Sequence, residues 1–203
     1  MTPDELSSDD YQPLGEMTHA TLAEFVVEYF LGRTSWLTWL HHWMSVITLI
    51  AAIAVAVVQG RGVPRTLGDF GLSIVALFVV ILPLHEALHA IAYRLAGARD
   101  IRWAYSLRIL AVWVIAHRFV AGTRAFLFVA LAPFVVINAA LIGGAFAFPQ
   151  YAVLLLFVLL VHLHGCAGDW SLLNFVWLHR ERGFWTYDDA VTGKSYFFGR
   201  GVR

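Results

Sequence analysis

Residues 72–95 read LSIVALFVVILPLHEALHAIAYRL, an apolar run that carries His85, Glu86 and His89. The run is long enough to cross a bilayer as a helix, for which about 20 residues suffice. A charged side chain at the bilayer centre costs about 2.5–3.5 kcal/mol on insertion scales, and such residues are seldom retained without a function. The run therefore predicts a membrane span that contains a functional site.

The three ionisable residues form the pattern His-Glu-x-x-His. On a helix, positions i and i+4 lie about 40° apart on one face, so His85 and His89 can bind one metal ion. Glu86, next to the first histidine, is placed to act as a general base toward a water held by that metal. The pattern predicts a zinc site, with a pair of structural core histidines as the less favoured alternative.

The composition indicates a multi-pass membrane protein. Of the 203 residues, 60% are hydrophobic and 14% are charged, compared with about 25% charged residues in ordinary soluble domains. The formal net charge of zero gives no indication of a nucleic-acid partner. A single cysteine, Cys166, excludes a disulfide framework and an all-cysteine zinc site.

Hydropathy predicts about four transmembrane helices. Pro83 lacks an N–H group, so we expect a kink just before the motif. Two glycines, Gly165 and Gly168, would let the last span approach its neighbours closely. The expected spans are 40–58, 70–96, 125–148 and 151–178.

The segments between and around the spans have their own patterns. Residues 1–16 are acidic and polar and predict a disordered tail, after which apolar residues at helical spacing predict an amphipathic helix. Residues 100–107 and 110–118 predict a β-hairpin at the membrane face between spans two and three. A cytoplasmic tail, 179–203, contains a second short hairpin around Gly193, and residues 17–178 form one membrane-embedded domain.

Lysine and arginine residues predict the orientation. Five arginines occupy 97–124, and four arginines with Lys194 occupy the C-terminal tail, whereas the other two connections carry Arg61 and Arg65 alone. The positive-inside rule then places both termini in the cytoplasm. Counted along straight helices, His89 and Asp169 lie at about the same depth, roughly 27–29 Å from the outer end and toward the cytoplasmic leaflet.

A catalytic zinc ion commonly takes three protein ligands and keeps one position for water. Asp169 is the expected third ligand, because an acid in an apolar span needs a partner. His162 is the second choice, either as a ligand or as a residue that orients one. Three weaker candidates remain, together with two asparagines that could stabilise an oxyanion: His164, Cys166 and Glu181, then Asn138 and Asn174.

The sequence resembles a known family over residues 70–178. The motif HEALH in a span, the strand-like segment after it, residues 117–133 and the pair Gly168-Asp169 are similar to the small four-span proteins described as putative zincin peptidases, which are related to the site-2 protease type of intramembrane zinc metalloprotease. The resemblance implies a zinc endopeptidase with His85, His89 and Asp169 as ligands and Glu86 as the catalytic base that activates water. It departs from the site-2 pattern because Asp169 stands in Ala-Gly-Asp-Trp and not in Leu-Asp-Gly.

Two alternatives from other classes remain open at this point. One is a non-proteolytic membrane protein with a structural metal or a pseudo-enzyme that binds substrates. The other is a metal-ion transporter that uses His85, His89 and Asp169 as a transit site. The expected partners are the lipid bilayer and a membrane-protein or peptide substrate, and the pattern does not predict an oligomeric state.

Overall fold

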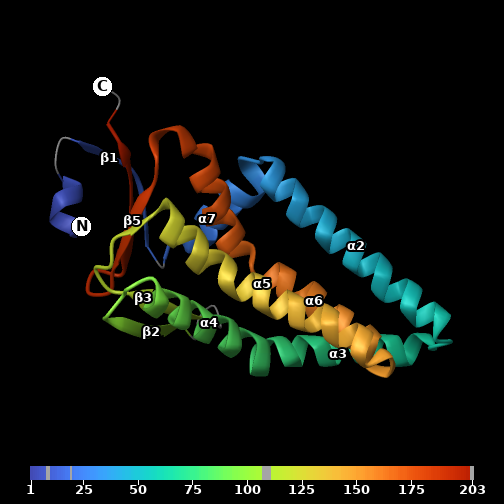
Figure 1. The fold of residues 1–203 in the computed structure, drawn as a ribbon. Coiled ribbons are helices and arrows are strands. Elements are labelled where there is room, and N and C mark those ends of the chain that lie inside the picture. Colours follow the sequence, from blue (N-terminus) through green and yellow to red (C-terminus); the bar gives the residue numbers. More distant parts are fainter. Residues whose placement is uncertain (8–9, 19, 107–110, 202–203) are drawn as a thin grey trace.

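The computed structural model describes residues 1–7, 10–18, 20–106 and 111–201. A small antiparallel sheet and both termini lie at one end of the molecule, and the helices α2 (Trp36–Val58) and α3 (Val63–Ala76) meet at the opposite end (Figure 1). The α-helices are α1 (Leu22–Val26), α2 (Trp36–Val58), α3 (Val63–Ala76), α4 (Leu82–Leu95), α5 (Thr123–Ala147), α6 (Ala152–Gly165) and α7 (Ala167–Leu178). The strands are β1 (Tyr11–Thr18), β2 (Ile101–Ser106), β3 (Ala111–Ala116), β4 (Ala121–Gly122), β5 (Trp185–Asp189) and β6 (Lys194–Arg200). The remaining helical turns are the 3-10 turns η1 (Pro3–Ser7), η4 (Pro149–Tyr151) and η5 (Arg180–Arg182) and the π turns η2 (Val27–Gly32) and η3 (Leu77–Ile81).

Three helices of the described residues are long and apolar enough to cross a membrane: Trp36–Val58, Val63–Leu95 and Thr123–Ala147. The first begins at Trp36, earlier than the predicted residue 40, because Ser35 caps it. The Ser35 side chain accepts a hydrogen bond from the Leu37 amide, and the Ser35 amide donates to Thr38 at 3.0 Å, which is a capping box.

The second of these helices is α3, η3 and α4 in continuous succession. Its π turn, Leu77–Ile81, ends two residues before Pro83. Because Pro83 has no N–H group for the carbonyl of Val79, the usual i to i−4 pattern cannot continue there. The irregularity expected before the HEALH motif is therefore present as a π turn.

The fourth expected span, 151–178, is not one straight helix. Helices α6 and α7 are bent by 50° at a break at Cys166, so the chain has a fourth span only if this bent pair crosses as one unit. Gly165 and Gly168 flank the break, and glycine is the weakest helix former after proline. The bend turns the first residues of α7, Asp169 among them, toward α4.

The β-hairpin expected after the second span is confirmed by the antiparallel pair β2–β3, in which Ile101 pairs with Ala116. Residues 107 and 110 of the expected strands lie outside the described residues. The hairpin expected in the C-terminal tail is also present as β5–β6, with Gly193 at φ 66° in its turn, a conformation that favours glycine.

The disordered tail expected over residues 1–16 is replaced by a strand in the structure. Strand β1 pairs with β6, so the sheet order is β1-β6-β5-β4. The strand forms because its main chain is hydrogen-bonded to β6. The polar composition of the segment does not reveal this long-range contact. The helical residues that follow are α1 and the π turn η2, beginning at Leu22 and not at Met17.

An aromatic core fixes the sheet to the end of the bundle. The ring of Phe175 on α7 lies 5.0 Å from that of Tyr29 in η2 and 5.1 Å from that of Phe197 on β6. Phe184, which is fully buried, packs on Phe126 of α5. Each buried aromatic side chain contributes about 1.5–3 kcal/mol of transfer free energy. These contacts stabilise the packing of the sheet on the ends of α4, α5 and α7.

Candidate metal centre

Helix α4 presents its motif residues toward the end of the bundle that the sheet covers. His85 and His89 are one helical turn apart and are 4% and 9% exposed. Their facing Nε2 atoms are 3.0 Å apart. Two ring nitrogens this close, both buried, need a shared proton or a shared cation between them.

Asp169, in the first turn of α7, completes the group. Its Oδ2 lies 3.0 Å from Nε2 of His85 and its Oδ1 lies 3.4 Å from Nε2 of His89. Three ligands at the usual zinc distance of 2.0–2.1 Å in a tetrahedron are separated from one another by about 3.3–3.4 Å. The three side chains, with donor atoms 3.0 to 3.4 Å apart, are thus close to the spacing that a tetrahedral zinc ion requires, with one position left for water.

Neighbouring groups fix the tautomers of both histidines. The Nδ1 of His89 lies 3.0 Å from the carbonyl oxygen of Val129, which can only accept, so Nδ1 carries the hydrogen and Nε2 is the free lone pair. That carbonyl is available because Pro133, four residues further along α5, has no N–H group to bond to it. Pro133 on α5 thus leaves the Val129 carbonyl free to orient His89 on α4.

His85 is oriented in the same way by a histidine on α6. Its Nδ1 lies 3.1 Å from Nε2 of His162, whose Nδ1 in turn lies 2.8 Å from Oδ1 of Asn138. The amide oxygen accepts from His162 Nδ1, which leaves His162 Nε2 to accept from His85 Nδ1. The free lone pair of His85 is then again on Nε2, directed toward Asp169.

The carboxylate of Glu86 lies beside this group and is held by the hairpin. The amide of Val114 on β3 donates to Oε2 of Glu86 at 2.9 Å, while β2 pairs with the opposite edge of β3. One carboxylate oxygen is thus fixed by a main-chain donor, and the other accepts no hydrogen bond from the described residues. A base held in this way keeps its orientation when a water is placed next to it.

The remaining sequence candidates lie elsewhere. His164 bonds to the carbonyl of Leu160 in its own helix, and Glu181 is exposed in η5. Asn174 donates to the carbonyls of Tyr29 and Arg33, and Asn138 bonds to His162, so neither points at the group. Cys166 forms a second set of close donor atoms with His85 and His162, its Sγ lying 3.4 Å from Nε2 of His162.

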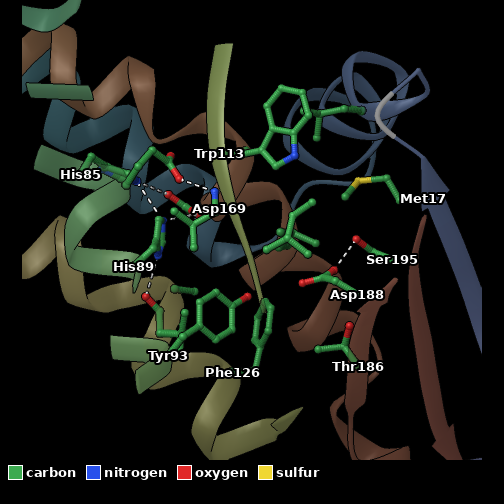
Figure 2. Close-up of a pocket in the computed structure, with 18 of the residues that line it drawn as sticks. Met17, His85, His89, Tyr93, Trp113, Phe126, Asp169, Thr186, Asp188 and Ser195 are labelled. Carbon is green, nitrogen blue, oxygen red and sulfur yellow. Dashed lines mark hydrogen bonds and ion pairs between the residues drawn. The ribbon is translucent and has the colours of Figure 1, made fainter. Parts of the chain in front are cut away.

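A cavity of about 250 Å³ opens between the bundle and the sheet, and His85, Glu86, His89 and Asp169 line it. Figure 2 shows the two histidines and Asp169 on one side of this pocket and Thr186, Asp188 and Ser195 of the sheet on the other. Tyr93 also lines the pocket. It was not among the site residues predicted from the sequence, although it follows His89 at i+4 and so continues the same helix face.

Comparison with known families bears on this arrangement. The model of a family described as putative zincin peptidase matches residues 78–182, just over half of the chain, and the match includes the motif, the hairpin and Asp169. The chain belongs to this family. No protein of curated function and no solved structure matches it.

Membership of the zincin family makes the chain a metallopeptidase at the level of the family description, with zinc as its metal. The described side chains fit that metal, as their spacing and tautomers show. The sheet strands β5 and β6 follow the matched region and β1 precedes it, so one wall of the pocket is built by parts of the chain outside the family match.

The hydrogen bond from His85 to His162 leads to a testable prediction. Replacing His162 by leucine removes the acceptor for His85 Nδ1, and we expect the zinc affinity to fall by about 10–100-fold. The matched control is His164→Leu, two residues away, which loses a bond to its own helix and a ring contact with His41 but no contact with His85. Zinc dissociation constants measured by competition with a chromogenic chelator in detergent decide the matter; equal affinities for both variants would refute the role of His162.

Proposed function

We propose that this protein is a membrane-embedded zinc endopeptidase that hydrolyses peptide bonds of membrane-associated proteins. The observation that carries the proposal is the spacing of His85, His89 and Asp169, with Glu86 beside them in one pocket. The proposal includes a relation to the site-2 protease type. It also places the pocket at the cytoplasmic face of the bilayer.

The residues divide the reaction between them. Zinc, when bound, supplies a Lewis acid that polarises the scissile carbonyl and lowers the pKa of an attacking water. His85, His89 and Asp169 hold the ion. Glu86 takes the proton from the water and later gives it to the leaving amine, so the carboxylate returns to its starting state.

The substrate would lie as an extended segment between the sheet and α4. Trp113 and Ile115 on β3 line the pocket, and an extended chain beside β3 would expose one carbonyl toward the metal residues. A helical substrate must therefore unwind locally. We expect cleavage near the end of a span, where a helix frays.

Reconstituted protein tests the proposal. Zinc-loaded protein in liposomes should cleave a fluorogenic apolar peptide or a co-reconstituted single-span protein, and 1,10-phenanthroline should reduce the rate to that of empty liposomes. Added zinc should restore it. Cleavage that persists in chelator after metal has been shown to be absent would contradict the proposal, as would a fully zinc-loaded protein that cleaves no peptide of a diverse set.

A further inference from the structure

The wall of the pocket opposite the metal residues carries one carboxylate without a cation. In the β5–β6 pairing, Asp188 lies opposite Ser195, and Met17 of β1 pairs with Ser195 on its other side. All three side chains line the pocket, as do Thr186 and Phe197 in the next row of the sheet. Asp189 and Lys194 line the cavity as well, but each of them has an oppositely charged partner, so Asp188, directed into the cavity (Figure 2), is the acid of this wall without one among the described residues.

The charged neighbours of Asp188 are all engaged with other groups. Lys194 bonds to Glu16 at 2.8 Å, and Arg118 directs its guanidinium toward Asp4 at 3.4 Å. Asp189 accepts from the amides of Val191 and Thr192 and lies 3.8 Å from His117. No Lys, Arg or His of the described residues lies within 4.0 Å of the Asp188 carboxylate, whose one bond in the structure comes from the Ser195 hydroxyl at 2.5 Å.

Such an acid is costly to keep. Burial raises the pKa of Asp188 to about 6, because the charged form loses water and gains only the Ser195 hydroxyl in return. The carboxylate is still mostly ionised at neutral pH. A cation brought by a ligand would supply the missing partner, in a cavity whose low dielectric strengthens the attraction.

We propose that Asp188 binds a lysine or arginine side chain of the substrate while the adjoining peptide bond lies at the metal residues. The proposal rests on the proposed peptidase function and names its substrate class, an extended apolar segment with a basic residue. The other lining residues suit the apolar part, among them Leu82, Phe126, Val129 and Leu172. Basic residues are characteristic of the cytoplasmic ends of membrane spans, which is where the proposed cleavage occurs.

A peptide series with full-length, zinc-loaded protein in detergent tests the assignment. A fluorogenic apolar peptide carries one lysine, moved one position at a time, and each peptide has a twin with norleucine at that position. We expect lysine to raise kcat/KM by about 10–100-fold at one position or two neighbouring ones, the usual size of a charge-assisted hydrogen bond in a desolvated site.

Two variants test whether the Asp188 carboxylate causes the lysine preference. Asp188→Asn keeps an oxygen for Ser195 but removes the charge, so it should abolish the lysine preference while norleucine peptides change by less than about twofold. Glu181→Gln, an exposed acid outside the pocket, should keep the preference. An unchanged zinc affinity of Asp188→Asn shows that this variant is folded. A native protein without lysine preference at any position, or a preference that survives in Asp188→Asn, would overturn the proposal.

Binding measured by fluorescence anisotropy keeps the two proposals apart. Cleavage without discrimination between lysine and norleucine would contradict the proposal for Asp188 and support the proposed peptidase function. Asp188-dependent discrimination in binding, without cleavage of any peptide, would support the basic-residue site and contradict the proposed peptidase function.

Discussion

Glu86→Gln is expected to lose cleavage by about 10²–10⁴-fold while it retains zinc. Glutamine has the same shape, and its amide oxygen can still accept from the Val114 amide, so the local structure should stay as it is. What is lost is the proton acceptor for the attacking water. Initial rates on a fluorogenic peptide and zinc content by inductively coupled plasma mass spectrometry, measured on the same preparation, give both quantities.

The control for this variant is Glu181→Gln, which changes an exposed carboxylate outside the pocket by the same one atom. Its rate should match that of the native protein. A Glu86→Gln protein with native cleavage would exclude Glu86 as the base, and one that loses zinc would move this residue from catalysis to metal binding.

Replacing Asp169 by alanine is expected to lower the zinc affinity by at least about 100-fold, more than loss of a residue that only orients a ligand. The carboxylate faces both histidines, and without it the ion keeps two protein ligands in place of three. Cleavage should fall with the metal content. Zinc titration with a competing chelator measures the change directly.

Asp188→Asn is the matched control, since it alters another acid of the same pocket that does not contact the histidines. Its zinc affinity should stay within about threefold of native. The opposite pattern, an intact affinity in Asp169→Ala with a loss in Cys166→Ser, would place the metal at the second set of donor atoms, His85, His162 and Cys166.

Local periodicity explains which parts of the fold could be predicted. The apolar runs give the long helices, and the HEALH spacing places two imidazoles and a carboxylate on one helix without any tertiary information. Alternation and turn residues give the hairpins β2–β3 and β5–β6, whose strands are neighbours along the chain. Asp169 could be chosen because an acid in an apolar span needs a partner.

Long-range contacts explain what could not be predicted. Strand β1 exists through its pairing with β6, almost the length of the chain away. The bend at Cys166 changes the direction in which His162 and Asp169 point, so their relation to His85 could not follow from a straight helix. The part of Pro133 in freeing the Val129 carbonyl becomes visible only when α4 is packed against α5. Asp188 could not be predicted as a site residue, because acids are common in polar tails. Its place in the pocket follows only from the packing of the sheet on the helices.

The coordination of zinc tests the central claim most directly. X-ray absorption at the zinc edge of the purified, loaded protein should show nitrogen and oxygen ligands alone, at about 2.0–2.1 Å, with the multiple scattering of two imidazoles. Binding by His85, His89 and Asp169 requires that result. A sulfur ligand at about 2.3 Å would place the ion on Cys166 and contradict the assignment.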